Sequence, residues 1–153
     1  MKVTECLDSE HRVFLLQLGV LERMLAENAA DGELRAVVLA LAEAVEKHRE
    51  VEEGLLYPAI RRAFGETFPP VAVMEHEHRQ IEQTIGALRS HSGSVPEAVR
   101  RLVEILRAHI QKETEVLFPM AEKKIPAEEL EHLAHRCASE HHACGEVSAH
   151  RGN

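Results

Sequence analysis

A pattern of histidine and glutamate occurs twice in this chain, and it constrains the fold more than any other feature. Each half has a lone histidine in a Glu-His-Arg tripeptide and, further on, a His-x-x-x-Glu pair. The first half reads Glu10-His11-Arg12 and His48-Arg-Glu-Val-Glu52, and the second reads Glu77-His78-Arg79 and His109-Ile-Gln-Lys-Glu113. The interval from the lone histidine to the paired one is 37 residues in the first half and 31 in the second. The difference is small enough to lie in a loop.

The spacing of each pair has a physical meaning on a helix. Residues i and i+4 are only about 40° apart around the axis, so a histidine and a glutamate one turn apart can serve one site. Two such halves predict four imidazoles and two carboxylates in one core, where the carboxylates can bridge two metals. A metal pair also removes the high cost of burying unpaired carboxylates. The candidate ligands are His11, His48, Glu52, His78, His109 and Glu113.

Apolar residues recur at helical spacing through almost the whole chain. The first predicted helix can be capped by Asp8 and Ser9 and has apolar positions at Val13, Leu16, Val20 and Met24. A second runs from Leu34 towards Ala63, a third begins at Pro69 and Pro70, a fourth runs from near Pro96 to Leu117, and a shorter fifth segment begins at Pro126. Short loops favour antiparallel neighbours, so we predict an all-α, antiparallel up-and-down four-helix bundle with an additional C-terminal helix.

The 153 residues fit a single domain. We place the bundle core at about 8–125 and the C-terminal helix and tail at 126–153. Pro58 and Pro119 follow the paired histidines by ten residues each and should kink or loosen their helices. Tyr57 and Phe118 precede these prolines and can form the ends of a pocket.

Composition narrows the class of protein further. The formal net charge is −8, which removes the electrostatic basis for binding nucleic acid. The longest apolar run, 36–42, is far shorter than the roughly 20 residues that span a bilayer, and the first ten residues lack the apolar segment of a signal peptide. The three cysteines are scattered and suggest no disulfide framework. We expect a cytoplasmic protein that binds neither nucleic acid nor membrane.

The ordered pattern resembles the hemerythrin-like (HHE cation-binding) domain over roughly 8–125. The resemblance implies a non-haem di-iron centre, with iron ions that an oxo or hydroxo group can bridge, held by the six candidate residues with Glu52 and Glu113 bridging. It also implies a protein that binds or senses O2, NO or peroxide, or handles iron in stress defence. Oxygen-carrying hemerythrins have another histidine where this chain has Met74, and their last carboxylate motif is one residue longer. These departures favour the bacterial variants linked to sensing, iron handling or stress defence.

Other interpretations remain open at this point. The same di-iron site can serve a redox enzyme for peroxide or NO chemistry or for iron-centre repair, although no separate general base is apparent. A ferritin-like iron oxidase or store uses Glu-x-x-His, which Glu75 and His78 match once. A metal-free helical adaptor is the third alternative.

Glu50, Glu53 and Glu115 are candidate surface carboxylates or outer hydrogen-bond partners of the histidines. In the C-terminal segment, Cys137, His141 and Cys144 share a helix face that we interpret as docking rather than metal binding.

Overall fold

The computed structural model describes the backbone of residues 1–146 and the side chains as far as residue 139. Within this part of the chain, all regular structure is helical, as the sequence predicts. The elements in chain order are α1 (Val3–Ala26), α2 (Asp31–Val51), η1 (Glu52–Leu56), α3 (Tyr57–Phe64), α4 (Pro69–Arg89), α5 (Val95–Lys112), η2 (Glu113–Leu117), α6 (Phe118–Lys124) and α7 (Ala127–Glu146).

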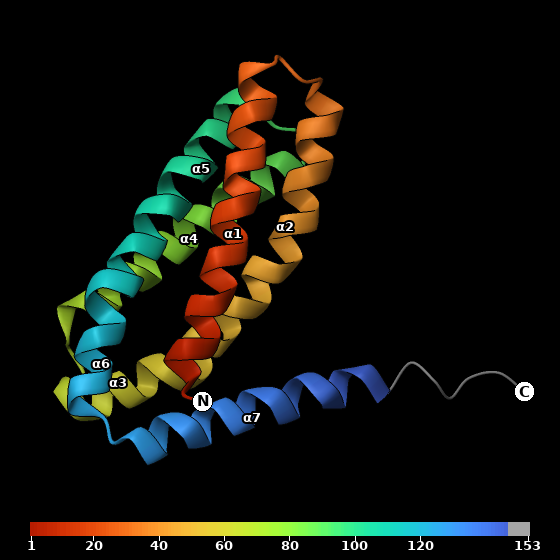
Figure 1. Cartoon of the computed structure of the whole chain (residues 1–153). Helices are drawn as coiled ribbons and strands as arrows, with labels where there is room; N and C mark the ends of the chain where they lie inside the picture. Colours follow the sequence, from red (N-terminus) through yellow and green to blue (C-terminus); the bar gives the residue numbers. More distant parts are fainter. Residues whose placement is uncertain (147–153) are drawn as a thin grey trace, which may run out of the picture.

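The four long helices that precede α7 pack along one another (Figure 1). Helix α1 contacts α2 and α5, and α4 contacts α5 and α2. Helix α2 continues through η1 into α3, and α5 continues through η2 into α6, so both extended rods reach the end of the molecule where the N-terminus lies. Helix α7 crosses that end and contacts α1 and η1.

The first helix begins five residues earlier than the predicted cap. Asp8 and Ser9 lie inside α1, which starts at Val3. The backbone N–H of Lys2 donates to the Glu5 carboxylate at 2.8 Å, which occupies a donor at the true helix start. The predicted cap position is therefore wrong, because a glutamate in the first turn binds the free N–H further upstream.

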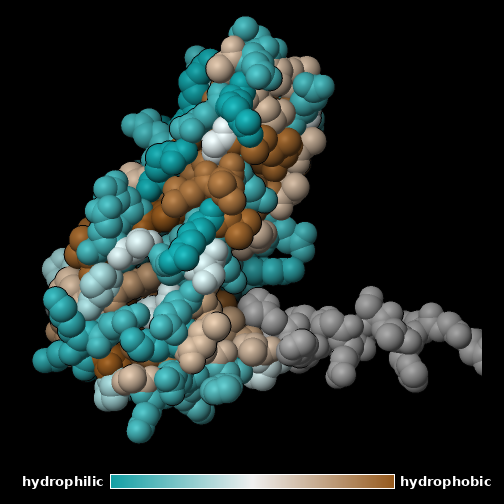
Figure 2. All heavy atoms as spheres, viewed as in Figure 1, coloured by the Kyte–Doolittle hydropathy of each residue, from teal (hydrophilic) through white to brown (hydrophobic). Residues whose placement is uncertain are grey.

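Three of the four apolar positions that the sequence assigns to α1 lie on its outer face, whereas Met24 is partly buried against the core. Val13, Leu16 and Val20 are 53%, 75% and 38% exposed, and Figure 2 shows apolar side chains on the face where α1 lies. The buried stripe contains Leu7, His11, Phe14, Leu18 and Leu21 instead. Two apolar stripes coexist on this helix, and the one that includes His11 and the large Phe14 side chain turns inward.

Each extended rod contains one π-helical turn that begins at a candidate metal ligand. The N–H of Tyr57 bonds the carbonyl of Glu52, and the N–H of Phe118 bonds the carbonyl of Glu113, so both turns close across five residues. Pro58 and Pro119 follow directly. Because a proline ring clashes with the carbonyl four residues before it, a wider turn relieves that clash. The loosening expected at both prolines therefore takes the form of a π-helical turn.

Two apolar clusters fill the interior, and polar side chains separate them. On α1, Leu7 belongs to one cluster and Phe14 to the other, with His11 between them. On α4, Met74 and Ile81 lie on either side of His78 in the same way. The buried Met74 thus packs in an apolar cluster, as expected of a core residue. Cys137 is partly buried against the same cluster, whereas the side chains of His141 and Cys144 lie outside the described part.

Candidate metal centre

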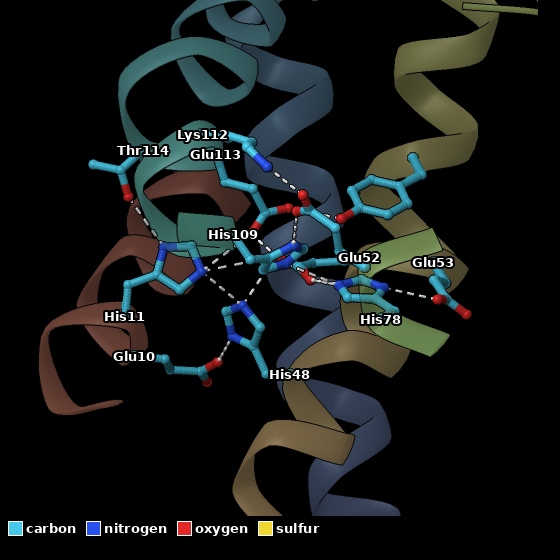
Figure 3. Close-up of polar contacts among 12 residues, drawn as sticks. Glu10, His11, His48, Glu52, Glu53, His78, His109, Lys112, Glu113 and Thr114 are labelled. Atoms are coloured by element: carbon cyan, nitrogen blue, oxygen red, sulfur yellow. Dashed lines mark hydrogen bonds and ion pairs between the residues drawn. The ribbon is translucent and has the colours of Figure 1, made fainter. Parts of the chain in front are cut away.

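All six candidate ligands are buried in the band between the two apolar clusters. They reach it from α1, from α2 and η1, from α4, and from α5 and η2 (Figure 3). Their nitrogen and oxygen atoms form two groups, in each of which the potential ligand atoms lie within 4.8 Å of one another. The groups are His11, His48, Glu52 and Glu113, and Glu52, His78, His109 and Glu113. The structure therefore brings together the residues that the repeat singles out, and both carboxylates belong to both groups.

The inner ring nitrogens face one another in pairs. His11 Nε2 lies 2.9 Å from His48 Nε2, and His78 Nε2 lies 3.1 Å from His109 Nε2. The two carboxylate oxygens of Glu52 face different pairs: Oε1 lies 2.9 Å from His48 Nε2, and Oε2 lies 3.1 Å from His78 Nε2. A single atom of Glu113, Oε2, faces both pairs.

Oε2 of Glu113 lies 3.3 Å from His11 Nε2 and 3.2 Å from His109 Nε2. The two carboxylates thus stand between the imidazole pairs in different ways. Glu52 offers one oxygen to each pair, whereas Glu113 turns the same oxygen towards both.

The outer ring nitrogens point away from the centre and have partners of their own. Three of these partners are carboxylates: Glu10 lies 2.6 Å from His48 Nδ1, Glu53 2.8 Å from His78 Nδ1, and Glu77 3.1 Å from His109 Nδ1. The fourth, 3.1 Å from His11 Nδ1, is the hydroxyl of Thr114. Since a carboxylate only accepts hydrogen bonds, Nδ1 of those three rings donates. In a neutral ring the lone pair then lies on Nε2 and points into the centre.

The outer partners could be predicted only in part. Glu53 does contact His78, but Glu50 is exposed and Glu115 accepts from Gln111. Glu10, Glu77 and Thr114 were missed. A signal for the first two exists, because each precedes the lone histidine of its half in the repeated Glu-His-Arg tripeptide.

Two aromatic rings close the site, as the sequence suggests. Tyr57 stacks on His78 with ring centroids 5.8 Å apart, and Phe118 stacks on His11 at 5.4 Å. Each ring therefore packs on the lone histidine of the other half. They differ in the hydroxyl of Tyr57, which donates to Glu113 Oε1 at 2.6 Å. Burial, together with the nearby Glu52 and Glu113 carboxylates, raises the pKa of Tyr57 well above its usual value, so the phenol keeps its proton.

The carboxylate oxygens at the centre lack ordinary partners. Both oxygens of Glu52 and Oε2 of Glu113 are fully buried and accept no hydrogen bond of normal geometry, although ring nitrogens lie at 2.9–3.3 Å. Buried charges without partners are unfavourable, and proteins normally pair them or use them to bind metals. Carboxylate oxygens beside imidazole nitrogens form a mixed donor set that suits iron or manganese. These residues fit a cation.

The negative charge of the buried carboxylates also changes the pKa values of the neighbouring histidines. Burial lowers the pKa of His48 and of His109, but the Glu52 and Glu113 carboxylates and the outer glutamates outweigh it and raise both pKa values to about 10. Burial also acts to raise the pKa of Glu113, yet the facing His109 and His11 rings hold it well below its usual value. Without a metal, protons on His48 and His109 therefore balance the buried carboxylates.

A cavity of about 20 Å³, enough for one water-sized molecule, lies on the imidazole side of the site. All four histidines line it, and its remaining walls are mainly apolar, including Phe14 and Ile81. At its rim, Arg49 of α2 pairs with Glu82 of α4 at 3.2 Å. Glu52, Glu113 and the two stacking rings do not line it, so the cavity and the carboxylates lie on different sides of the centre.

Fold and site together define an all-helical protein with buried histidine and glutamate groups that can hold a metal. Comparison with known families agrees: the hemerythrin HHE cation-binding domain matches residues 2–121. The chain belongs to this family.

Two curated relatives are named iron-sulfur cluster repair protein YtfE. The protein from Escherichia coli O157:H7 is 29% identical over 122 residues, which cover 70% of this chain and 56% of the relative. The protein from Salmonella newport is 30% identical over 123 residues, with the same coverage. The chain thus spans little more than half the length of these relatives. No solved structure matches the chain. None of the helices in the described part has the length and apolar character needed to cross a membrane.

Proposed function

We propose that this chain is a non-haem di-iron protein of the hemerythrin type, with one metal position in each imidazole pair. The proposed ligands are His11, His48, Glu52, His78, His109 and Glu113, with Glu52 and Glu113 bridging. The observation that carries the proposal is the set of buried carboxylate oxygens that lie between two imidazole pairs and accept no ordinary hydrogen bond. The proposed scaffold is one domain, 1–153, with an antiparallel up-and-down four-helix bundle as its core (about 8–125) and a C-terminal helix and tail (126–153).

The residues around the site would prepare it for a metal in distinct ways. Glu10, Glu53 and Glu77 accept from Nδ1 of their histidines, which fixes each ring so that Nε2 faces the centre. The stacked rings of Tyr57 and Phe118 hold His78 and His11 in place and keep water from that side. When bound, an iron pair supplies a redox-active centre with room for a small ligand.

The cavity supports the proposal of a small ligand. It is small and mainly apolar, and its polar lining consists of the four imidazoles and the charged Glu46, Arg49 and Glu82. Such a space suits a small molecule with little or no charge, and O2, NO and peroxide meet this requirement. Met74 packs in the apolar cluster on the side of the centre away from the cavity and adds no nitrogen ligand, so the six proposed residues would supply all the protein ligands.

Stress defence is the biological role that we propose. The YtfE relatives are named for iron-sulfur cluster repair, and iron handling of this kind fits a buried iron site next to a small-molecule cavity. We place the chain in the cytoplasm and propose no nucleic-acid or membrane partner. A redox enzyme that uses the same centre is the alternative, and steady turnover of peroxide or NO, lost in His48→Ala, would favour it.

The test is metal content per chain after anaerobic iron loading and removal of unbound metal. We expect two iron ions in the wild type and a marked loss in Glu52→Gln and Glu113→Gln. Glu50→Gln removes an equal charge from an exposed position on α2 and should retain both ions. Unchanged stability of the two site variants with no iron bound by the wild type would instead favour the metal-free adaptor. Large shell-like oligomers would favour the ferritin-like alternative.

A further inference from the structure

The internal repeat allows the two imidazole pairs to be compared position by position. The glutamate before each lone histidine plays the same part in both halves, since Glu10 bonds His48 and Glu77 bonds His109. The residue after each bridging glutamate also bonds the lone histidine of the other half. At this position the two halves differ in residue type. The partner of His78 is Glu53, whereas the partner of His11 is Thr114.

The two outer partners differ in charge as well as in shape. Glu53 places a carboxylate 2.8 Å from Nδ1 of His78. The partner of His11 is the neutral hydroxyl of Thr114. This hydroxyl donates a hydrogen bond to Asp8 at 3.2 Å, and Asp8 forms an ion pair with Arg12 at 2.8 Å. A carboxylate on the outer nitrogen makes an imidazole a stronger metal ligand. One pair therefore has carboxylates on both rings, and the other has a carboxylate on only one.

One contact acts in the opposite direction. The Lys112 ammonium pairs with Glu77, the outer partner of His109, and withdraws part of its charge. The Lys112 side chain is about half exposed, so water screens this effect. The other oxygen of Glu77 still contacts His109 Nδ1. Lys112 therefore reduces the difference between the pairs but does not remove it.

We propose that the two metal positions are unequal and fill in order, with the position of His78 and His109 binding a metal ion more tightly than the position of His11 and His48. The proposal rests on the proposed di-metal function and adds a binding order to it. Loss of an outer partner of a metal-bound histidine typically lowers metal affinity by about 10- to 100-fold. Because Thr114 still bonds His11 and Lys112 offsets part of the difference, we expect the two dissociation constants to differ by about tenfold, the lower end of that range.

The experiment is a stepwise titration of metal-free protein with ferrous iron in the absence of oxygen, against a chelator of known affinity. The wild type should bind two ions in two resolved steps. Glu53→Gln keeps the size of the side chain but removes its charge, so it should weaken the tighter step and bring the two steps together. Thr114→Val removes the hydroxyl beside His11, so it should weaken the weaker step and separate the two steps further.

Opposite shifts in the two variants distinguish this proposal from general damage to the site. Glu50→Gln should leave both steps unchanged, and circular dichroism should show that every variant keeps its helix content. Two equal steps in the wild type, or a separation that Glu53→Gln does not narrow, would overturn the unequal positions while leaving the di-metal function intact. Absence of any iron binding in the wild type would instead overturn the proposed function itself.

Discussion

At the scale of single residues, Tyr57 shows how one hydroxyl group separates two otherwise similar halves. Tyr57 and Phe118 occupy equivalent positions in the repeat and stack on equivalent histidines. The phenol hydroxyl bonds Oε1 of Glu113, whereas Glu52 has no such donor on either oxygen. Tyr57 thus leaves Oε2 as the atom of Glu113 that faces both imidazole pairs. The hydroxyl of Tyr57 therefore positions the Glu113 carboxylate, which belongs to both groups of potential metal ligands.

Replacing Tyr57 by phenylalanine should destabilise the metal-free chain. The change leaves Oε1 of the buried Glu113 without a donor, and hydrogen bonds to charged groups contribute about 1.5–3 kcal/mol. We expect a loss of that size in the free energy of unfolding, measured by denaturant titration of the metal-free protein. Thr84→Val is the control, because it removes a largely buried hydroxyl that bonds only a carbonyl of its own helix. Equal stability of Tyr57→Phe and the wild type would show that the hydroxyl does not hold Glu113.

At the scale of helices, the sequence predicts the elements well but not their inner details. Periodicity and proline positions locate the long helices, and α4 begins at Pro69 as expected. Repeat spacing alone identifies the six residues that meet in the centre. The sequence cannot show that Val13, Leu16 and Val20 face outward, because α1 has two apolar stripes and only packing selects one. Nor can it assign Thr114 to His11, because that contact depends on how α1 and η2 lie together.

The π-helical turns are the element that sets the register between each bridging glutamate and the aromatic ring that follows. An alanine inserted after Gly54 adds a residue that the π-helical turn, already closed across five residues, cannot absorb, and should rotate Tyr57 by about 100° relative to Glu52. The hydrogen bond to Glu113 would then be lost. Tyr57 is the chain's sole tyrosine and there is no tryptophan, so intrinsic fluorescence reports on this position. We expect a changed tyrosine emission and weaker iron binding in the insertion variant.

Gly54→Ala is the matched control for this insertion. A Cβ added at Gly54 meets no atom within 4 Å, and alanine stabilises a helical position by about 0.5–1 kcal/mol relative to glycine. The substitution should keep the tyrosine emission and raise the melting temperature slightly. If the insertion behaved like the substitution, the register of η1 would have no part in positioning Tyr57.

At the scale of the whole molecule, helices α2 and α4 meet over the cavity, and surface ion pairs join them there. Arg49 pairs with Glu82, and Arg89 pairs with Glu46 at 2.7 Å. Exposed ion pairs of this kind contribute about 0–1 kcal/mol, so the rim of the cavity can open at low cost.

Glu82→Ala should therefore speed the binding of NO to the iron-loaded protein, measured by stopped-flow absorbance, with a stability change below about 1 kcal/mol. Glu43→Ala breaks the exposed pair with Lys47 within α2 and should leave the rate unchanged.

The charge of the buried centre links the stability of the whole fold to pH, and the direction depends on the metal. In the metal-free chain, the pKa values of His48 and His109 are raised to about 10, compared with about 6.5 in an unfolded chain. Between these values the folded chain binds more protons than the unfolded chain, so its free energy of unfolding falls as pH rises. Their stabilising contribution is complete only below about pH 6.5. A metal takes the place of these protons, so metal binding strengthens as pH rises and weakens in acid.

The two forms of the protein should therefore respond to pH in opposite ways. We expect the melting temperature of metal-free protein to fall between pH 6.5 and 9, while the additional stability given by bound iron grows over the same range. Thermal denaturation of both forms at matched pH values measures this difference. His91→Gln changes an exposed histidine far from the centre in sequence and should not alter either trend. A metal-free chain that gained stability between pH 6.5 and 9 would contradict protons on His48 and His109 as the balance of the buried carboxylates, because groups with raised pKa values make stability fall over this range.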